Sequence, residues 1–141
     1  MQRAPPARRE SADVANALAS EQGEGAGVVA GVASARATNE DLFTFRRLLS
    51  ELGSEAAYVA VRRGAADALL VKQEKAPNAA GARALGFADA EQVVERIRGG
   101  AVDVLIVFGS ELLDAALLGA VDPLGELDTV IVIDTHKSDL E

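Results

Sequence analysis

The sequence contains no cysteine, and its 141 residues include a single histidine. Without cysteine, the chain itself can form no disulfide, offer no thiolate to a metal or iron–sulfur cluster, and use no cysteine nucleophile. Aromatic residues make up only 4% of the chain against 49% hydrophobic residues, so the core must be aliphatic. No apolar run approaches the roughly 20 residues needed to span a bilayer. We therefore expect a soluble, cytoplasmic protein without direct membrane insertion.

Basic residues are also scarce, and the formal net charge is −8. This balance argues against a nucleic-acid partner, because neutralising phosphates requires clustered Lys and Arg. The basic cluster Arg3, Arg8 and Arg9 surrounds two prolines, which favours a flexible tail over a nucleic-acid arm. We expect a tail with a weak helix over residues 1–22 and one domain over residues 23–141.

Two β-rich apolar runs organise the domain, at residues 102–108 and 129–133. A helical pattern at 111–118 separates them, which predicts a parallel βαβ unit. Further strands are predicted at 26–33 and 57–61, and 68–71 is either a short strand or a strand end facing a loop; helices are predicted near 39–52, 79–85 and 90–98. We expect a Rossmann-like α/β three-layer sandwich with a mainly parallel sheet of about four strands.

The clearest helix begins after Thr38, which can cap it together with Asp41 three residues later. Its buried stripe is predicted to be Leu42, Phe45, Leu48, Leu49 and Leu52, with Gly53 ending it. Asp89 is the expected cap of the helix at 90–98. After the last strand only a few residues remain, so we expect the chain to be cut in mid-fold or to depend on a partner that covers that face.

Two loops are candidate ligand sites because they follow the strongest strands. Gly109 and Ser110, before Glu111, either hold a phosphate at a helix N-terminus or form a tight turn in which Ser110 caps the helix. Asp134 and Thr135 either contact a ribose hydroxyl or cap the next turn. The adjacent His136 is expected to be solvated.

Other polar groups also have two interpretations. Asn39, Glu40 and Asp41 could suggest a divalent metal, but neighbours on one helical turn point in different directions, so capping is favoured. Lys72, Glu74 and Lys75 either meet a phosphate or form a solvated loop. We assign no catalytic residue and no metal site, although a small hydrolase or transferase remains a third hypothesis.

Several segments together resemble the molybdopterin oxidoreductase family. Residues 34–43, which contain Thr38-Asn39-Glu40-Asp41, resemble its S-x-x-x-T-N-E-[ED] motif. Residues 75–82, followed by Leu85-Gly86, resemble its N-P-N-x-x-G-A…L-G loop. Residues 104–109 resemble its strand-G segment, and residues 130–138 resemble the strand and D-T-x-x-[TS] loop that precede an A-D-V-V-L-P motif. The likeness spans about residues 26–141 and is closest to the large iron–sulfur subunit of bacterial NADH–quinone oxidoreductase (complex I).

The resemblance implies a Rossmann-like segment of a much larger subunit. In molybdenum enzymes of this family such domains hold the guanine nucleotide parts of molybdopterin guanine dinucleotide, whereas in the complex I subunit the fold is largely structural. The resemblance therefore implies a non-catalytic segment whose partners are other subunits or domains of the oxidoreductase, placed peripherally at the inner membrane through them. It also implies the alternative, a nucleotide or pterin dinucleotide site at Gly109, Ser110, Asp134 and Thr135.

Overall fold

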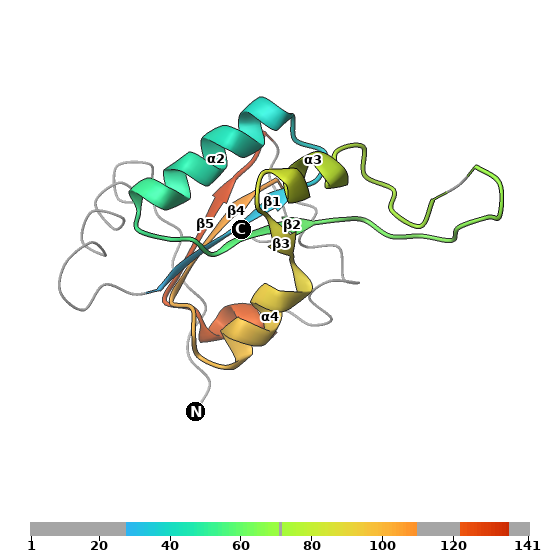
Figure 1. Cartoon of the computed structure of the whole chain (residues 1–141). Coiled ribbons are helices and arrows are strands. Elements are labelled where there is room, and N and C mark those ends of the chain that lie inside the picture. Colours follow the sequence, from blue (N-terminus) through green and yellow to red (C-terminus); the bar gives the residue numbers. More distant parts are fainter. Residues whose placement is uncertain (1–27, 71, 110–121, 136–141) are drawn as a thin grey trace.

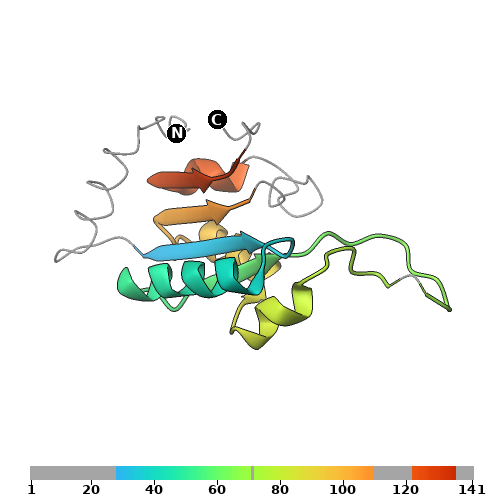
Figure 2. The same cartoon turned by 90° about the horizontal axis from the view of Figure 1, so that it is seen from above.

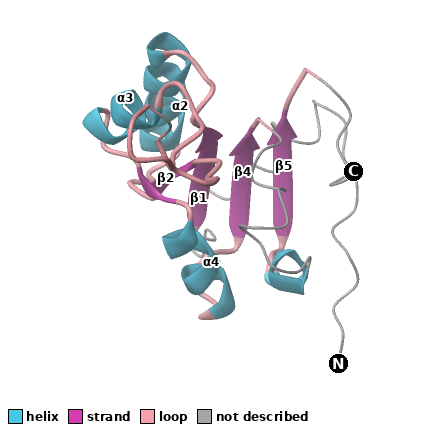
Figure 3. Cartoon of the chain, turned by 90° about the vertical axis from the view of Figure 1, so that its right-hand side faces the viewer, coloured by secondary structure: helices cyan, strands magenta, loops and turns pink. Residues whose placement is uncertain are grey.

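A five-stranded, all-parallel sheet forms the centre of the protein (Figure 1). The computed structural model describes residues 28–70, 72–109 and 122–135. In chain order the elements are β1 Val29–Ser34, α2 Asn39–Glu51, β2 Ala57–Ala60, α3 Ala79–Ala84, β3 Ala88–Asp89, α4 Glu91–Arg98, β4 Val104–Phe108, the 3₁₀ helix η2 Asp122–Glu126 and β5 Thr129–Ile133. The strand order is β3-β2-β1-β4-β5. Figure 3 shows β1, β4 and β5 side by side.

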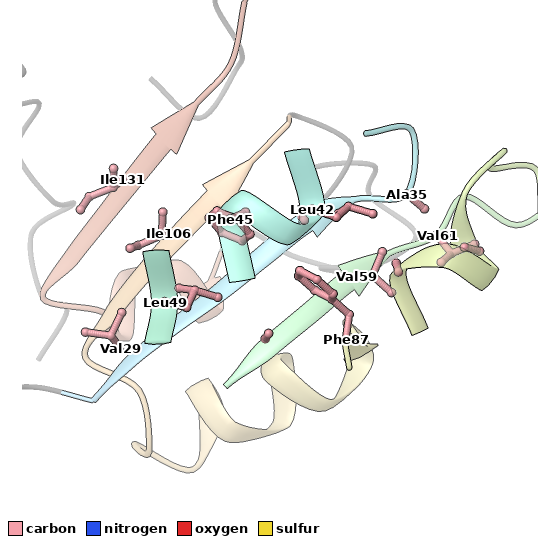
Figure 4. Close-up of a cluster of buried hydrophobic side chains, with 14 of the residues drawn as sticks. Val29, Ala35, Leu42, Phe45, Leu49, Val59, Val61, Phe87, Ile106 and Ile131 are labelled. Carbon is pink, nitrogen blue, oxygen red and sulfur yellow. The ribbon is translucent and has the colours of Figure 1, made fainter. Parts of the chain in front are cut away.

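Helices cover both faces of this sheet. Helices α2 and α3 lie on one face, where Leu42, Phe45 and Leu49 of α2 enter a cluster with Val59 and Ile106 (Figure 4). On the other face, α4 and η2 pack against β1 and β4 in a second cluster, which includes Val32, Val93, Ile97, Leu105 and Leu124. The expected three-layer α/β sandwich is confirmed, with five strands rather than four.

The central strands have apolar side chains on both faces, because helices cover both. In β4, Ile106 belongs to the first cluster, whereas Leu105 and Val107 belong to the second. All three side chains are at most 1% exposed. Burial on both sides explains why this strand reads as a continuous apolar run rather than an alternating one.

The start of α2 is as predicted. Thr38 Oγ1 accepts a hydrogen bond from the backbone N–H of Asp41 at 3.2 Å, and donates to the Asp41 carboxylate at 3.0 Å. Leu42, Phe45 and Leu49 are buried, but Leu48 is 37% exposed and only partly fits the predicted stripe.

Two local expectations differ from the structure. Asp89 does not cap α4; it ends the two-residue strand β3, and Ala90 occupies the cap position without a side-chain bond. Residues 68–70 form a bend rather than a strand. The expected helices at 12–22 and 111–118 lie outside the described residues.

Within the described ranges, no helix has the length and apolarity that crossing a bilayer requires.

A long connection leaves the compact body between β2 and α3 (Figure 2). We call residues 61–78 the arm, of which all but position 71 are described. Its two sides pair near the base, where Lys75 N–H donates to the Arg62 carbonyl at 2.8 Å and Gly64 N–H to the Gln73 carbonyl at 2.9 Å. The arm is far longer than the usual two to six residues of such loops.

Candidate functional site

The strand order places a topological switch point between β1 and β4. The chain runs from β1 outward through β2 to β3, then returns to the other side of β1 as β4 and continues to β5. In open parallel sheets, ligands bind in the crevice beyond the carboxyl ends of the two strands at such a point. The candidate site is therefore formed by the residues that follow Ser34 and Phe108.

Gly109, one of the residues predicted to form a site, lies at this switch point. Its φ is +88°, a conformation that favours glycine, and its N–H donates to the Ile133 carbonyl at 2.9 Å. A Cβ at Gly109 would lie 2.8 Å from Ser34 Cβ. The carboxyl end of β1 therefore lies close against the residue that follows β4.

The other predicted site residues are only partly brought to this place. Asp134 and Thr135 follow β5, beside β4, and both are exposed. One Asp134 carboxylate oxygen accepts a hydrogen bond from the Thr135 N–H at 2.6 Å. This local bond favours the interpretation in which Asp134 caps a turn. Ser110, Glu111 and His136 lie outside the described residues.

The backbone N–H groups of the loop after β1 are hydrogen-bonded within the protein. The N–H of Ala35 donates to the Ala60 carbonyl, that of Arg36 to Ser34 Oγ, and that of Ala37 to the Ser34 carbonyl. Phosphate sites at this position of the fold depend on backbone N–H groups that point at the ligand. Here three successive N–H groups already have partners inside the protein.

The first turn of α2 is also unfavourable for an anion. Asp41 N–H is bonded to Thr38 Oγ1, and Glu40 and Asp41 place two carboxylates at the positive end of the helix dipole. Negative side chains at that position stabilise the helix but repel a phosphate.

Asn78 holds the same loop from the outside, a role for which the sequence has no local signal, since Asn after Pro indicates only a turn. Its side-chain Nδ2 donates to the Ala37 carbonyl at 3.0 Å and to Asn39 Oδ1 at 2.8 Å, while its backbone N–H donates to the Ala35 carbonyl at 3.0 Å. These three bonds join segments that lie far apart in the chain.

Gly81 makes this contact possible. A Cβ there would lie 2.1 Å from Asn78 Oδ1 and 2.4 Å from Asn39 Oδ1. Asn39 belongs to the T-N-E-D motif, and Asn78 and Gly81 to the N-x-x-G motif. Two of the four segments in which the sequence resembles that family are therefore in contact. The only sign of this contact in the sequence is that both segments occur in it.

A separate hollow of about 780 Å³ lies at the opposite, amino end of β1 and β2. Val28, Leu52, Ser54, Tyr58 and Arg96 contribute to its lining. Two of its polar groups have partners in the protein: Arg96 Nη1 donates to the Tyr58 hydroxyl at 2.8 Å, and Ser54 Oγ donates to the Val29 carbonyl at 2.6 Å. The hollow thus lies away from the switch point, and none of the predicted site residues lines it.

Ion pairs fasten the base of the arm to the body. Arg83 of α3 bridges Glu74 of the arm and Asp89 of β3, and Arg63 of the arm lies 2.9 Å from Glu91 of α4. The hydrogen bond from Arg83 lowers the pKa of Glu74 below its ordinary value. The same hydrogen bond raises the pKa of Arg83 above its ordinary value. Glu74 is therefore part of an ion network rather than simply solvated.

Lys75 is engaged as well. Its Nζ donates to the Ala65 carbonyl at 2.7 Å and to the Lys72 carbonyl at 2.6 Å, so its ammonium group crosslinks the two sides of the arm. Among residues 28–70, 72–109 and 122–135, no three His, Asp or Glu side chains gather as a candidate metal site.

Comparison of the chain with protein-family models, curated proteins and solved structures finds no match in any of the three. Function is consequently inferred from the geometry of the switch point and from the motifs in the sequence.

Proposed function

We propose that this chain is a non-catalytic structural segment of a larger oxidoreductase assembly, resembling part of the large iron–sulfur subunit of NADH–quinone oxidoreductase. In this role it supports NADH-to-quinone electron transfer through the architecture of the assembly and holds no cofactor itself. Its partners are the other subunits or domains of the oxidoreductase. They hold it in the cytoplasm, at the periphery of the inner membrane.

One observation carries the proposal: on the β1 side of the switch point, the backbone N–H groups of residues 35–37 already have partners inside the protein. Ser34 lies against Gly109, and Asn78 fastens the loop between β1 and α2 to the loop before α3. A nucleotide site needs space and backbone donors at this position. Contact between the two family motifs favours the same conclusion, because it gives the Asn and Gly positions of those motifs a purely structural task here.

A second candidate is a binding module for a nucleotide or for molybdopterin guanine dinucleotide. The observation that favours it is the strand order: Gly109 follows the carboxyl end of β4, and Asp134 and Thr135 follow that of the neighbouring parallel strand β5. In this alternative, Gly109 and Ser110 approach a phosphate, and Asp134 accepts a hydrogen bond from a ribose hydroxyl.

Isothermal titration separates the two functions. We expect no saturable heat when GDP, NADH or molybdopterin guanine dinucleotide is added to the purified chain. Binding tighter than about 10 μM, equivalent to roughly 7 kcal/mol, would refute the purely structural function. In that case an Asp134→Asn variant shows whether the carboxylate contributes to the binding.

A positive test uses the assembly itself. A tagged chain is expressed in cells that make the oxidoreductase, and the purified fraction is assayed for NADH oxidation and for iron–sulfur signals by electron paramagnetic resonance. We expect both to co-purify with the chain, although it has no cysteine. A chain recovered without either would contradict the proposed function.

A further inference from the structure

The tip of the arm exposes two adjacent leucines. Leu69 is 88% exposed and Leu70 is 90% exposed, whereas the other exposed large hydrophobic side chains of the described residues reach at most 59%, at Phe43. Single apolar side chains on a surface are ordinary, whereas contiguous exposed apolar surface is typical of interaction sites. Figures 1 and 2 show that this loop extends away from both helical layers.

The tip is held in a defined shape. The Asp67 carboxylate oxygen Oδ1 accepts the N–H of Leu69 at 3.0 Å and the N–H of Leu70 at 2.7 Å. Below the tip, Lys75 Nζ joins the carbonyls of Ala65 and Lys72. These contacts present the two leucines in one arrangement, which lowers the entropy that docking would otherwise cost.

The base of the arm is fixed to the body at two further points. Arg83 bridges Glu74 and Asp89, and Arg63 pairs with Glu91. Ion pairs with α3, β3 and α4 thus support the base of the arm.

The charge of the arm is opposite to that of the rest of the chain. Its basic side chains outnumber its acidic ones, within a chain of net charge −8. The basic residues are Arg62, Arg63, Lys72 and Lys75, and the acidic residues are Asp67 and Glu74. An apolar tip above a basic stem is complementary to an apolar groove with a carboxylate rim. Complementary charge of this kind speeds encounter and selects the partner.

We infer that the arm is the docking element of this chain, and that Leu69 and Leu70 insert into an apolar groove with an acidic rim on a neighbouring polypeptide of the assembly. The inference rests on the proposed function and names its contact surface. The occupant is a protein surface, because two leucines gain little from a phosphate backbone and the proposed function places this chain against other polypeptides.

Photo-crosslinking within the assembly tests this inference. The photoreactive amino acid p-benzoylphenylalanine replaces Leu70 in one variant and Phe43 in a matched control, since both positions are exposed and apolar but lie on different elements. The assembly is purified through a different subunit and then irradiated. We expect the Leu70 variant to crosslink to a peptide in which apolar residues adjoin Asp or Glu, at least tenfold more often than the Phe43 variant.

A second measurement uses the variants L69S/L70S and F43S. We expect the double variant to enter the assembly at least tenfold less than the natural chain, while F43S enters within twofold of it. Because both leucines are exposed, the thermal midpoint of the isolated L69S/L70S chain should be unchanged, which excludes misfolding.

The outcomes separate this inference from the proposed function. Absence of the natural chain from the assembly would contradict the function. Presence of the chain with unaltered entry of L69S/L70S, or crosslinks from position 70 to lipid, to nucleic acid or to a second copy of this chain, would overturn the docking inference alone.

Discussion

Replacing Gly109 by alanine tests how closely the ends of β1 and β4 pack at the switch point. The change places a Cβ on a residue with φ of +88°, and that Cβ would lie 2.8 Å from Ser34 Cβ. Left-handed backbone costs a non-glycine residue about 1–2 kcal/mol. Overpacking against a buried neighbour costs about 1–3 kcal/mol more. We therefore expect Gly109→Ala to lower the free energy of unfolding by about 2–4 kcal/mol.

Gly100 is a matched control for the backbone contribution. It has φ of +68°, but a Cβ there meets no heavy atom within 4 Å. Gly100→Ala should therefore cost only the conformational part, about 1 kcal/mol after the gain from a less flexible unfolded chain. The difference between the two variants measures the contact with Ser34.

Urea unfolding followed by far-ultraviolet circular dichroism provides both values, because a domain of this size is expected to unfold in one cooperative step. A double-mutant cycle with Ser34→Gly isolates the contact further. We expect the double variant to lose less stability than the sum of the single variants, by about 1–2 kcal/mol. If Gly109→Ala costs no more than Gly100→Ala, or if the cycle is additive, Gly109 does not pack against Ser34 as the structure shows.

Two further predictions concern the loops beside this site. Asn78→Ala removes the hydrogen bonds from Nδ2 to Ala37 and Asn39, and should lower the free energy of unfolding by about 1–3 kcal/mol in the same urea assay. An unchanged unfolding midpoint would show that these two bonds are not formed. Because Arg83 lowers the folded-state pKa of Glu74, the stabilisation from this pair is present above the unfolded pKa of about 4.3 and is lost as pH falls through the lower folded value. A carbon-detected NMR titration should therefore place the Glu74 midpoint below its ordinary value, and Arg83→Met should return it there; equal midpoints in the two proteins would contradict the pairing.

The sequence is sufficient to predict the elements that have a strong periodic or apolar signal. The α2 helix, with Thr38 as its cap, and the buried strand β4 are both recognisable, because capping and two-sided burial leave local patterns. Strand β3 is not recognisable, since two residues carry no period. The expectation that Asp89 caps a helix is consequently wrong, and Asp89 pairs with Arg83 instead.

The sequence predicts that Gly109 ends a strand, because a β-rich apolar run that stops at glycine is a local pattern. It does not predict the contacts of Ser34 with Gly109 and of Asn78 with Asn39, which join segments far apart in the chain. Such contacts have no local signature, so only the resemblance of both motifs to one family links them at the level of sequence.

The pairing at the base of the arm has a consequence for how this sequence can change. Because Lys75 N–H bonds to the Arg62 carbonyl, the chain enters and leaves the arm at nearly the same point. The residues between these two positions therefore form a closed loop outside the sheet. The stability of the fold then depends only weakly on the length of the arm beyond that point, since the free-energy cost of closing a loop rises slowly with its length. The sequence of the tip can therefore change while the Rossmann-like body stays the same.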